Sequence, residues 1–85
     1  MTPQEIESQV RDFIFQYFHL AGENSDLSNH VSLLESGVVD STGILELVAF
    51  LEETYRIVIE NEDLVPSNLD SVNNIVSFVR RKLGI

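Results

Sequence analysis

Apolar residues recur at helical spacing from the first few residues of the chain onward. Thr2, Pro3 and Glu5 form a capping-box pattern, with proline at the first helical position. The apolar positions of the face that follows are Ile6, Val10, Phe13, Ile14, Tyr17 and Phe18. The pattern predicts a helix from Pro3 to about Leu20, although the run FIFQYFHL by itself would also suit a strand.

The segment from Ala21 to Asp40 has no regular period, yet it is rich in apolar residues. These are Leu27, Val31, Leu33, Leu34, Val38 and Val39. They are too many for a free loop, because a loop in water would leave them exposed. The segment therefore predicts a long ordered connection that packs against the core, and long ordered loops often carry function.

A second helical pattern starts after Asp40, whose side chain suits the N-cap of a helix. The stripe expected to be buried consists of Ile44, Leu47, Val48, Leu51 and Tyr55. Leu45 and Ala49 lie off this stripe, and they neighbour Ser41 by the i, i+4 rule. The pattern predicts a helix that begins directly after Asp40 and has Ser41 exposed in its first turn.

Two shorter features follow this helix. The RIVIE segment, residues 56–60, is rich in β-branched residues but has no partner run with which to form a sheet. It therefore predicts an extended connector. Asn61 is expected to cap a single helical turn through Leu64, which Pro66 stops.

The last helical pattern begins after Asp70 or Ser71, either of which suits an N-cap. Its inward positions are Val72, Ile75, Val76, Val79 and Leu83. The basic residues 80–82 suit the negative pole of the helix dipole. Together the patterns predict one all-α domain over residues 1–85, a small four-helix bundle of three main helices plus one short helical turn. A long loop joins helices one and two, which are expected to pack antiparallel or nearly so.

The distribution of charge adds an acidic surface to this bundle. Fourteen Asp and Glu residues against five Lys and Arg residues give a net charge of −9. Between Asp12 and Tyr55 there is no Lys or Arg, whereas these acids fall there: Glu23, Asp26, Glu35, Asp40, Glu46, Glu52 and Glu53. Such a field repels nucleic acid and anionic membranes, and it speeds encounters with basic patches on proteins. We therefore expect protein partners, with no nucleic acid and no membrane insertion.

Few residues are candidates for chemistry. The chain has no cysteine, which excludes disulfides and thiolate metal sites. His19 and His30 have no ligand spacing, so no metal site is predicted. The opening MTPQEIESQV lacks the pattern of a signal peptide, and no apolar run reaches a membrane-spanning length. We expect a cytoplasmic monomer without a catalytic site of its own.

Ser41 is the candidate functional residue, as an attachment point and not as a nucleophile. The G-x-S-x-G pattern of a nucleophile elbow is only half met, because Val39 and Gly43 flank the serine. No motif places a base beside it. At the first turn of a helix, however, free backbone N–H groups and the helix dipole stabilise a phosphodiester. A partner enzyme can supply the base and the metal for its attachment.

The segment LLESGVVDSTGILELVAFLEETYRIVIENEDLVPSNLDSVNNIVSFV resembles an acyl carrier protein or the related aminoacyl and peptidyl carrier domains. The resemblance runs from Ile6 to Leu83 and is most specific from Gly37 to Glu53. It implies that Ser41 receives 4′-phosphopantetheine from coenzyme A through a magnesium-using holo-synthase, a phosphopantetheinyl transferase. The thiol at the end of this arm then carries an acyl group as a thioester between enzymes.

The same resemblance implies that the helix after Ser41 is the surface that partners recognise. It assigns charge contacts to Asp40, Glu46, Glu52 and Glu53, and an apolar patch to Leu45 and Ala49. Most family members have Leu or Met where this chain has Thr42, and often an acid where it has Gly43. We expect these two positions to filter partners. The pattern favours a stand-alone carrier of a dedicated pathway, loaded by an acyl- or aminoacyl-adenylating ligase and serving a downstream acyltransferase or synthase.

Two alternatives to an acyl carrier remain open at this stage. One is an aminoacyl carrier of the D-alanyl or peptidyl type, and the other is an unmodified acidic helical adaptor that binds basic partners. For an acyl carrier, we expect a short chain to be sheltered between the helices. The residues expected to line that space are Leu33, Leu34, Ile44, Leu47, Leu51, Leu64 and Ile75.

Overall fold

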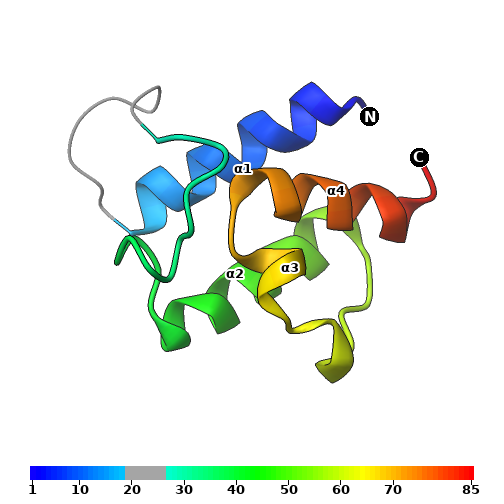
Figure 1. Ribbon diagram of the computed structural model, residues 1–85. Coiled ribbons are helices and arrows are strands. Elements are labelled where there is room, and N and C mark those ends of the chain that lie inside the picture. Colours follow the sequence, from blue (N-terminus) through cyan, green and yellow to red (C-terminus); the bar gives the residue numbers. More distant parts are fainter. Residues whose placement is uncertain (19–26) are drawn as a thin grey trace.

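Helices make up all the regular structure in the computed structural model, which describes residues 1–18 and 27–85. The elements are α1 (Pro3–Tyr17), α2 (Ser41–Tyr55), the 3-10 turn η2 (Asn61–Asp63), α3 (Pro66–Leu69) and α4 (Val72–Leu83) (Figure 1). The described residues contain no strand, and the predicted all-α class is confirmed.

Helix α1 begins at the predicted capping box. The Thr2 hydroxyl accepts the Glu5 N–H at 3.1 Å, and the Glu5 carboxylate accepts the Thr2 N–H at 3.1 Å. Phe18 is the C-cap, and its N–H donates to the Ile14 carbonyl. The predicted end at about Leu20 lies outside the described residues.

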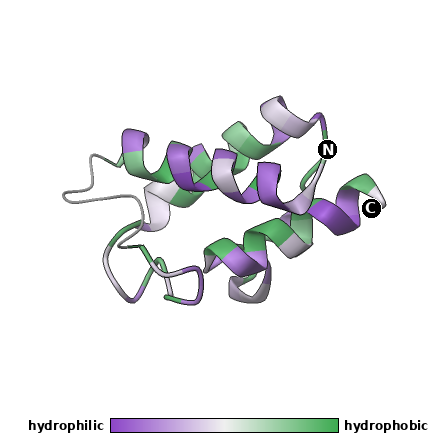
Figure 2. Cartoon of the chain, turned by 90° about the horizontal axis from the view of Figure 1, so that it is seen from above, coloured by the Kyte–Doolittle hydropathy of each residue, from purple (hydrophilic) through white to green (hydrophobic). Residues whose placement is uncertain are grey.

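The core is built from one face of each long helix together with the long connection. Each long helix carries both hydrophobic and hydrophilic residues along its length (Figure 2). The side chains with almost no exposed surface are Ile6, Val10, Ile14, Leu33, Val39, Leu47, Leu51, Val72, Ile75 and Val79. Most positions predicted on the apolar faces of the helices are buried, but Phe13, Phe18, Ile44, Val48, Val76 and Leu83 are only partly buried, and Tyr17 is 46% exposed. Phe78, which the pattern did not assign to the core, is 2% exposed.

The second half of the connection between α1 and α2 is ordered, as predicted, because Asp70 binds three of its residues in succession. The Asp70 carboxylate accepts the Ser32 hydroxyl at 2.5 Å and the Leu34 N–H at 2.9 Å. The Asp70 carbonyl accepts the N–H of Leu33 at 2.7 Å, and the Leu33 side chain is fully buried. These bonds hold the connection against the junction of α3 and α4.

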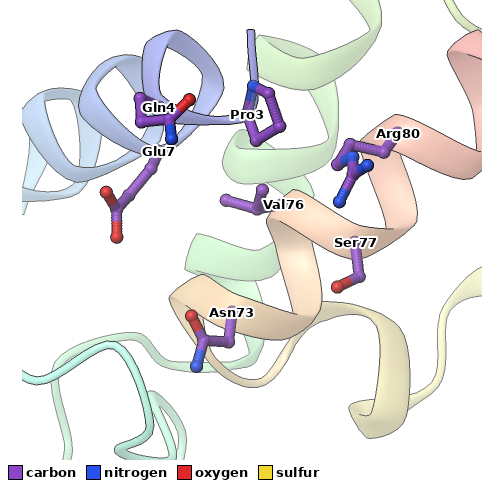
Figure 3. A pocket seen from close by; sticks show the side chains of 7 residues that line it. All are labelled: Pro3, Gln4, Glu7, Asn73, Val76, Ser77 and Arg80. Carbon is purple, nitrogen blue, oxygen red and sulfur yellow. The ribbon is translucent and has the colours of Figure 1, made fainter. Parts of the chain in front are cut away.

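Asn29 ties the same connection to the other side of the bundle. Its side-chain amide bonds to both Arg11 and Glu7 of α1. Its carbonyl accepts the Asn73 N–H of α4 at 3.0 Å. Glu7 and Asn73 lie on opposite sides of a shallow groove of about 390 Å³ between α1 and α4, which Arg80 also lines (Figure 3).

The segment between α2 and α4 contains more structure than predicted. Glu60, not Asn61, is the N-cap of the 3-10 turn, because Asn61 already has helical geometry. Pro66 does not only stop that turn: it starts α3, where a proline at the first position needs no N–H partner. Of the two predicted caps of α4, Ser71 takes the role, and its hydroxyl accepts the Asn74 N–H at 3.1 Å. Asp70 is instead the C-cap of α3.

The basic end of α4 holds this segment in place. Lys82 Nζ lies 2.8 Å from Asp63 Oδ2 of the 3-10 turn. Arg81 donates to the Asn68 side chain of α3 at 2.7 Å. The hydrogen bond from Lys82 is the main reason that the pKa of Asp63 is lowered.

Helices α1 and α2 run antiparallel, as predicted (Figure 1). Aromatic side chains meet in the seam between them. The rings of Phe13 and Phe50 stack with centroids 4.2 Å apart. Farther along, the Tyr55 hydroxyl donates to Gln9 Oε1 at 2.8 Å, and burial raises the pKa of Tyr55 to about 12.

At the other end of the seam, Phe18 packs on the first turn of α2. A Cβ placed on Gly43 would lie 2.6 Å from Phe18 Cε1 and 3.1 Å from Val39 Cγ1. A side chain at position 43 therefore requires the ring to move. Glycine at this position is a packing requirement of the seam.

We predict that the effect of Gly43→Ala on stability depends on Phe18. With Phe18 present, overpacking should lower the free energy of unfolding by about 1 kcal/mol. In a Phe18→Ala background the same change should be neutral or stabilising, because Ala is the better helix former. Urea unfolding of the wild type, the two single variants and the double variant measures the coupling between positions 18 and 43. Additive effects of the two substitutions would show that the ring does not press on Gly43.

Candidate functional site

Ser41 is the first residue of α2 and is exposed. Asp40 is the N-cap, as predicted, and its Oδ1 accepts the Gly43 N–H at 2.7 Å. The Asp40 carbonyl accepts the Ile44 N–H at 3.1 Å. The hydroxyl of Ser41 therefore stands where backbone N–H groups point out of the helix without carbonyl partners from a preceding turn. An anionic group attached to it would be stabilised by the positive end of the helix dipole.

A tight turn and a buried anchor lead the chain into this helix start. Gly37 has φ of 79°, a left-handed conformation that suits glycine, and its N–H donates to the Leu34 carbonyl at 3.2 Å. The Val39 side chain is buried, and its N–H donates a hydrogen bond to the Leu33 carbonyl at 3.0 Å. With Val39 held inside, Asp40 and Ser41 emerge at the surface.

The exposed side of α2 carries most of the residues predicted to meet partners. We call this surface the docking face; its residues are Asp40, Thr42, Leu45, Glu46, Ala49, Glu52 and Glu53. All are exposed except Glu52, which is partly buried. Leu45 is 62% exposed, the most exposed large apolar residue of α2. The docking face therefore has an apolar centre, Leu45 and Ala49, with acidic residues around it.

The three glutamates of the docking face are not equivalent. Glu46 lies on the side of α1, close to the Tyr17 hydroxyl. Desolvation, followed by the nearby charge of Glu46, raises the pKa of Tyr17. Glu52 lies on the opposite side, where its Oε2 accepts the Ile59 N–H of the connector at 3.0 Å. Glu53 is exposed and has no hydrogen-bond partner among the described residues.

The contacts of Glu52 and Glu46 could not be derived from the spacing of the acids. Glu52 and Ile59 are only seven positions apart, but their hydrogen bond depends on the course of the chain after α2. The proximity of Glu46 to Tyr17 depends on the antiparallel packing of α1 and α2. The sequence signal available was the position of Tyr17 at the end of the first apolar stripe.

The expectation that Gly43 filters partners by lacking a charge at the surface is wrong. Gly43 is buried beneath Phe18 and faces α1, so a carboxylate at this position would enter the seam. Thr42 is exposed beside Ser41 and stays a candidate for that role.

An apolar cavity of about 190 Å³ lies between the start of α2, the long connection and α3. Its lining residues are Leu34, Ile44, Leu64, Val65, Pro66, Leu69 and Asp70. Of the residues predicted to line a shelter for cargo, Leu34, Ile44 and Leu64 do so. The others do not, because they are fully buried in the core: Leu33, Leu47, Leu51 and Ile75. Ile44 connects the cavity to Ser41, which lies one helical turn earlier.

The described residues contain no cluster of three or more His, Asp or Glu side chains that could hold a metal ion. The His30 ring bonds to the Asn73 amide at 3.0 Å, and His19 lies outside the described residues. In the same described part of the chain, no helix is long and apolar enough to cross a membrane.

Comparison with known proteins identifies the family of the chain. No family model matches the chain. A curated protein of Serratia sp. (strain ATCC 39006), described as the probable acyl carrier protein PigG, is 33% identical over 76 residues. The match covers 89% of this chain and 86% of that relative. The chain therefore belongs to the acyl carrier protein family.

Proposed function

We propose that this protein carries an acyl group between the enzymes of a dedicated biosynthetic pathway, on a 4′-phosphopantetheine arm attached to Ser41. The observation that carries the proposal is the exposed Ser41 hydroxyl at the capped start of α2, in a chain of the acyl carrier protein family. When attached, the arm supplies a terminal thiol that holds the acyl group as a thioester.

Ser41 fits the attachment better than the neighbouring hydroxyls do. The Ser36 hydroxyl is engaged within its turn, where it donates to the Leu33 carbonyl at 3.2 Å. Ser41 makes no side-chain hydrogen bond to any described residue, so its oxygen is free to react. Thr42 is exposed as well, but its branched side chain is more hindered than that of a serine.

The docking face would meet the enzymes that load and unload the carrier. These are a phosphopantetheinyl transferase, an acyl- or aminoacyl-adenylating ligase, and a downstream acyltransferase or synthase. Leu45 and Ala49 would supply the apolar centre of a small, transient interface. The surrounding acids would attract basic patches and raise the rate of encounter.

The cavity beside α2 gives the cargo a place to shelter. Burial of each methylene in an apolar space contributes about 0.8 kcal/mol. Leu34 and Leu64 are partly exposed at this cavity, so their side chains can move aside at little packing cost. A cavity of about 190 Å³ suits a short acyl chain better than a long one.

We predict that coexpression with a phosphopantetheinyl transferase adds the mass of one arm to the protein. Ser41→Ala should abolish the addition without unfolding the domain, because the exposed side chain supports no described contact. Ser36→Ala is the matched control and should be modified like the wild type. Intact mass measures the attachment of the arm, and circular dichroism measures whether the domain stays folded. An arm that is still attached to Ser41→Ala would place the site elsewhere, and a wild type that gains no mass would favour an unmodified adaptor.

We predict that a hexanoyl or octanoyl chain loaded on the arm enters the apolar cavity. The methyl resonances of Leu34, Ile44 and Leu64 should shift relative to the unloaded holo-protein, since these side chains line the cavity. Those of Val10 and Val79, on the far side of the core, serve as internal controls. Shifts restricted to residues around Ser41 would show that the chain stays in solvent.

We predict that Glu53→Lys slows modification by the transferase about tenfold at low salt and much less at high salt, because screening weakens the encounter. Glu62→Lys is the matched control: it makes the same change in net charge at an exposed acid outside α2. Initial rates over a salt series measure the effect. Equal slowing by the two variants would indicate that only the net charge matters and that α2 is not the docking surface.

A further inference from the structure

Tyr17 of α1 borders the docking face although it does not belong to α2. Tyr17 is 46% exposed, and the charge of the nearby Glu46 contributes to raising the pKa of its hydroxyl. Its ring stacks on Phe13 with centroids 5.2 Å apart and meets Phe18 edge-on at 5.0 Å. Phe13 in turn stacks on Phe50 of α2, so Tyr17 is held between two rings beside α2 and still presents part of its surface to solvent.

The surface on this side continues from α2 onto α1. A shallow groove of about 360 Å³ runs along the seam between the two helices. Its walls include Phe13 and Gln16 of α1 and Phe50 and Thr54 of α2. An enzyme that covers the docking face near Glu46 would also lie over the exposed edge of α1.

The chemistry of this corner suits one kind of side chain. Glu46 offers a carboxylate whose partner among the described residues is an uncharged phenol, and Tyr17 offers an aromatic ring beside it. The chain has no Lys or Arg between Asp12 and Tyr55 to neutralise this region. A guanidinium group can pair with a carboxylate and stack on a ring at the same time, whereas an ammonium group is more strongly hydrated and lacks the planar surface.

We propose that Tyr17 is part of the docking surface, and that Tyr17 and Glu46 together receive an arginine side chain from the basic patch of the transferase that modifies Ser41. The inference rests on the proposed function and adds a residue of α1 to a surface otherwise formed by α2. In this arrangement Tyr17 supplies the ring on which the guanidinium stacks, and Glu46 supplies the carboxylate with which it pairs.

Chemical footprinting of the wild-type protein tests the contact directly. The chain has two tyrosines, and Tyr55 is only 5% exposed with its hydroxyl bonded to Gln9. A nitrating reagent should therefore modify Tyr17 first. A saturating amount of transferase, without coenzyme A so that no transfer occurs, should slow nitration of Tyr17 several-fold. An equal amount of an unrelated basic protein should not. Nitration of Tyr17 at the same rate with and without the transferase would overturn the inference.

Substitution gives an independent readout. Tyr17→Ala should slow modification of Ser41 several-fold, and Tyr17→Phe should have a smaller effect because it keeps the ring and loses only the hydroxyl. Ser8→Ala is a control on the opposite side of α1, about two and a half turns away. Val58→Ala is a control at an apolar side chain that is 66% exposed and lies outside the docking face.

The outcomes separate the inference from the function on which it rests. If the wild type is modified but Tyr17→Ala is modified at the same rate, the inference is wrong and the proposed function stands. If the wild type gains no arm, both fall. If Tyr17→Ala loses helicity, the footprint on the wild-type protein decides the question, because it requires no substitution.

Discussion

The position of Ser41 depends on the bonds that Asp70 makes across the bundle. One residue at the junction of α3 and α4 binds Ser32, Leu33 and Leu34 in succession, through its carboxylate and its carbonyl. These contacts join parts of the chain that are 36 to 38 residues apart. Because they hold the connection, Leu33 enters the core, Leu34 lies at the apolar cavity, and the chain arrives at Asp40 in position to start α2. Ser41, the next residue, is thereby exposed at the start of α2.

The docking face is organised by its neighbours on both sides. The connector holds Glu52 on one side through the Ile59 N–H, and Glu46 lies beside Tyr17 of α1 on the other. A carboxylate that is already held loses less conformational entropy on binding than a free one, so Glu52 would contribute to the proposed interface at a lower entropic cost. Between them, Leu45 remains uncovered.

The three long helices followed from the sequence because they depend on local patterns. The capping box at Thr2, the N-cap at Asp40 and most of the buried positions were readable from spacing. The features that could not be predicted depend on contacts between distant segments. Nothing near Gly43 in the sequence shows that Phe18 covers it, so its absent side chain was interpreted as a surface property. The start of α3 at Pro66 was missed for a related reason, since a proline suits the first position of a helix as well as the end of a turn.

We propose that Ser41, at the start of α2, carries a phosphopantetheine arm with acyl cargo. Peptide-resolved mass spectrometry of the protein purified from its native source is a direct test of this proposal. We predict that the peptide containing Ser41 carries the arm, and that part of the population holds an acyl group that hydroxylamine releases from its thioester. A native protein whose Ser41 peptide is unmodified, or whose arm lies on another residue, would contradict the account.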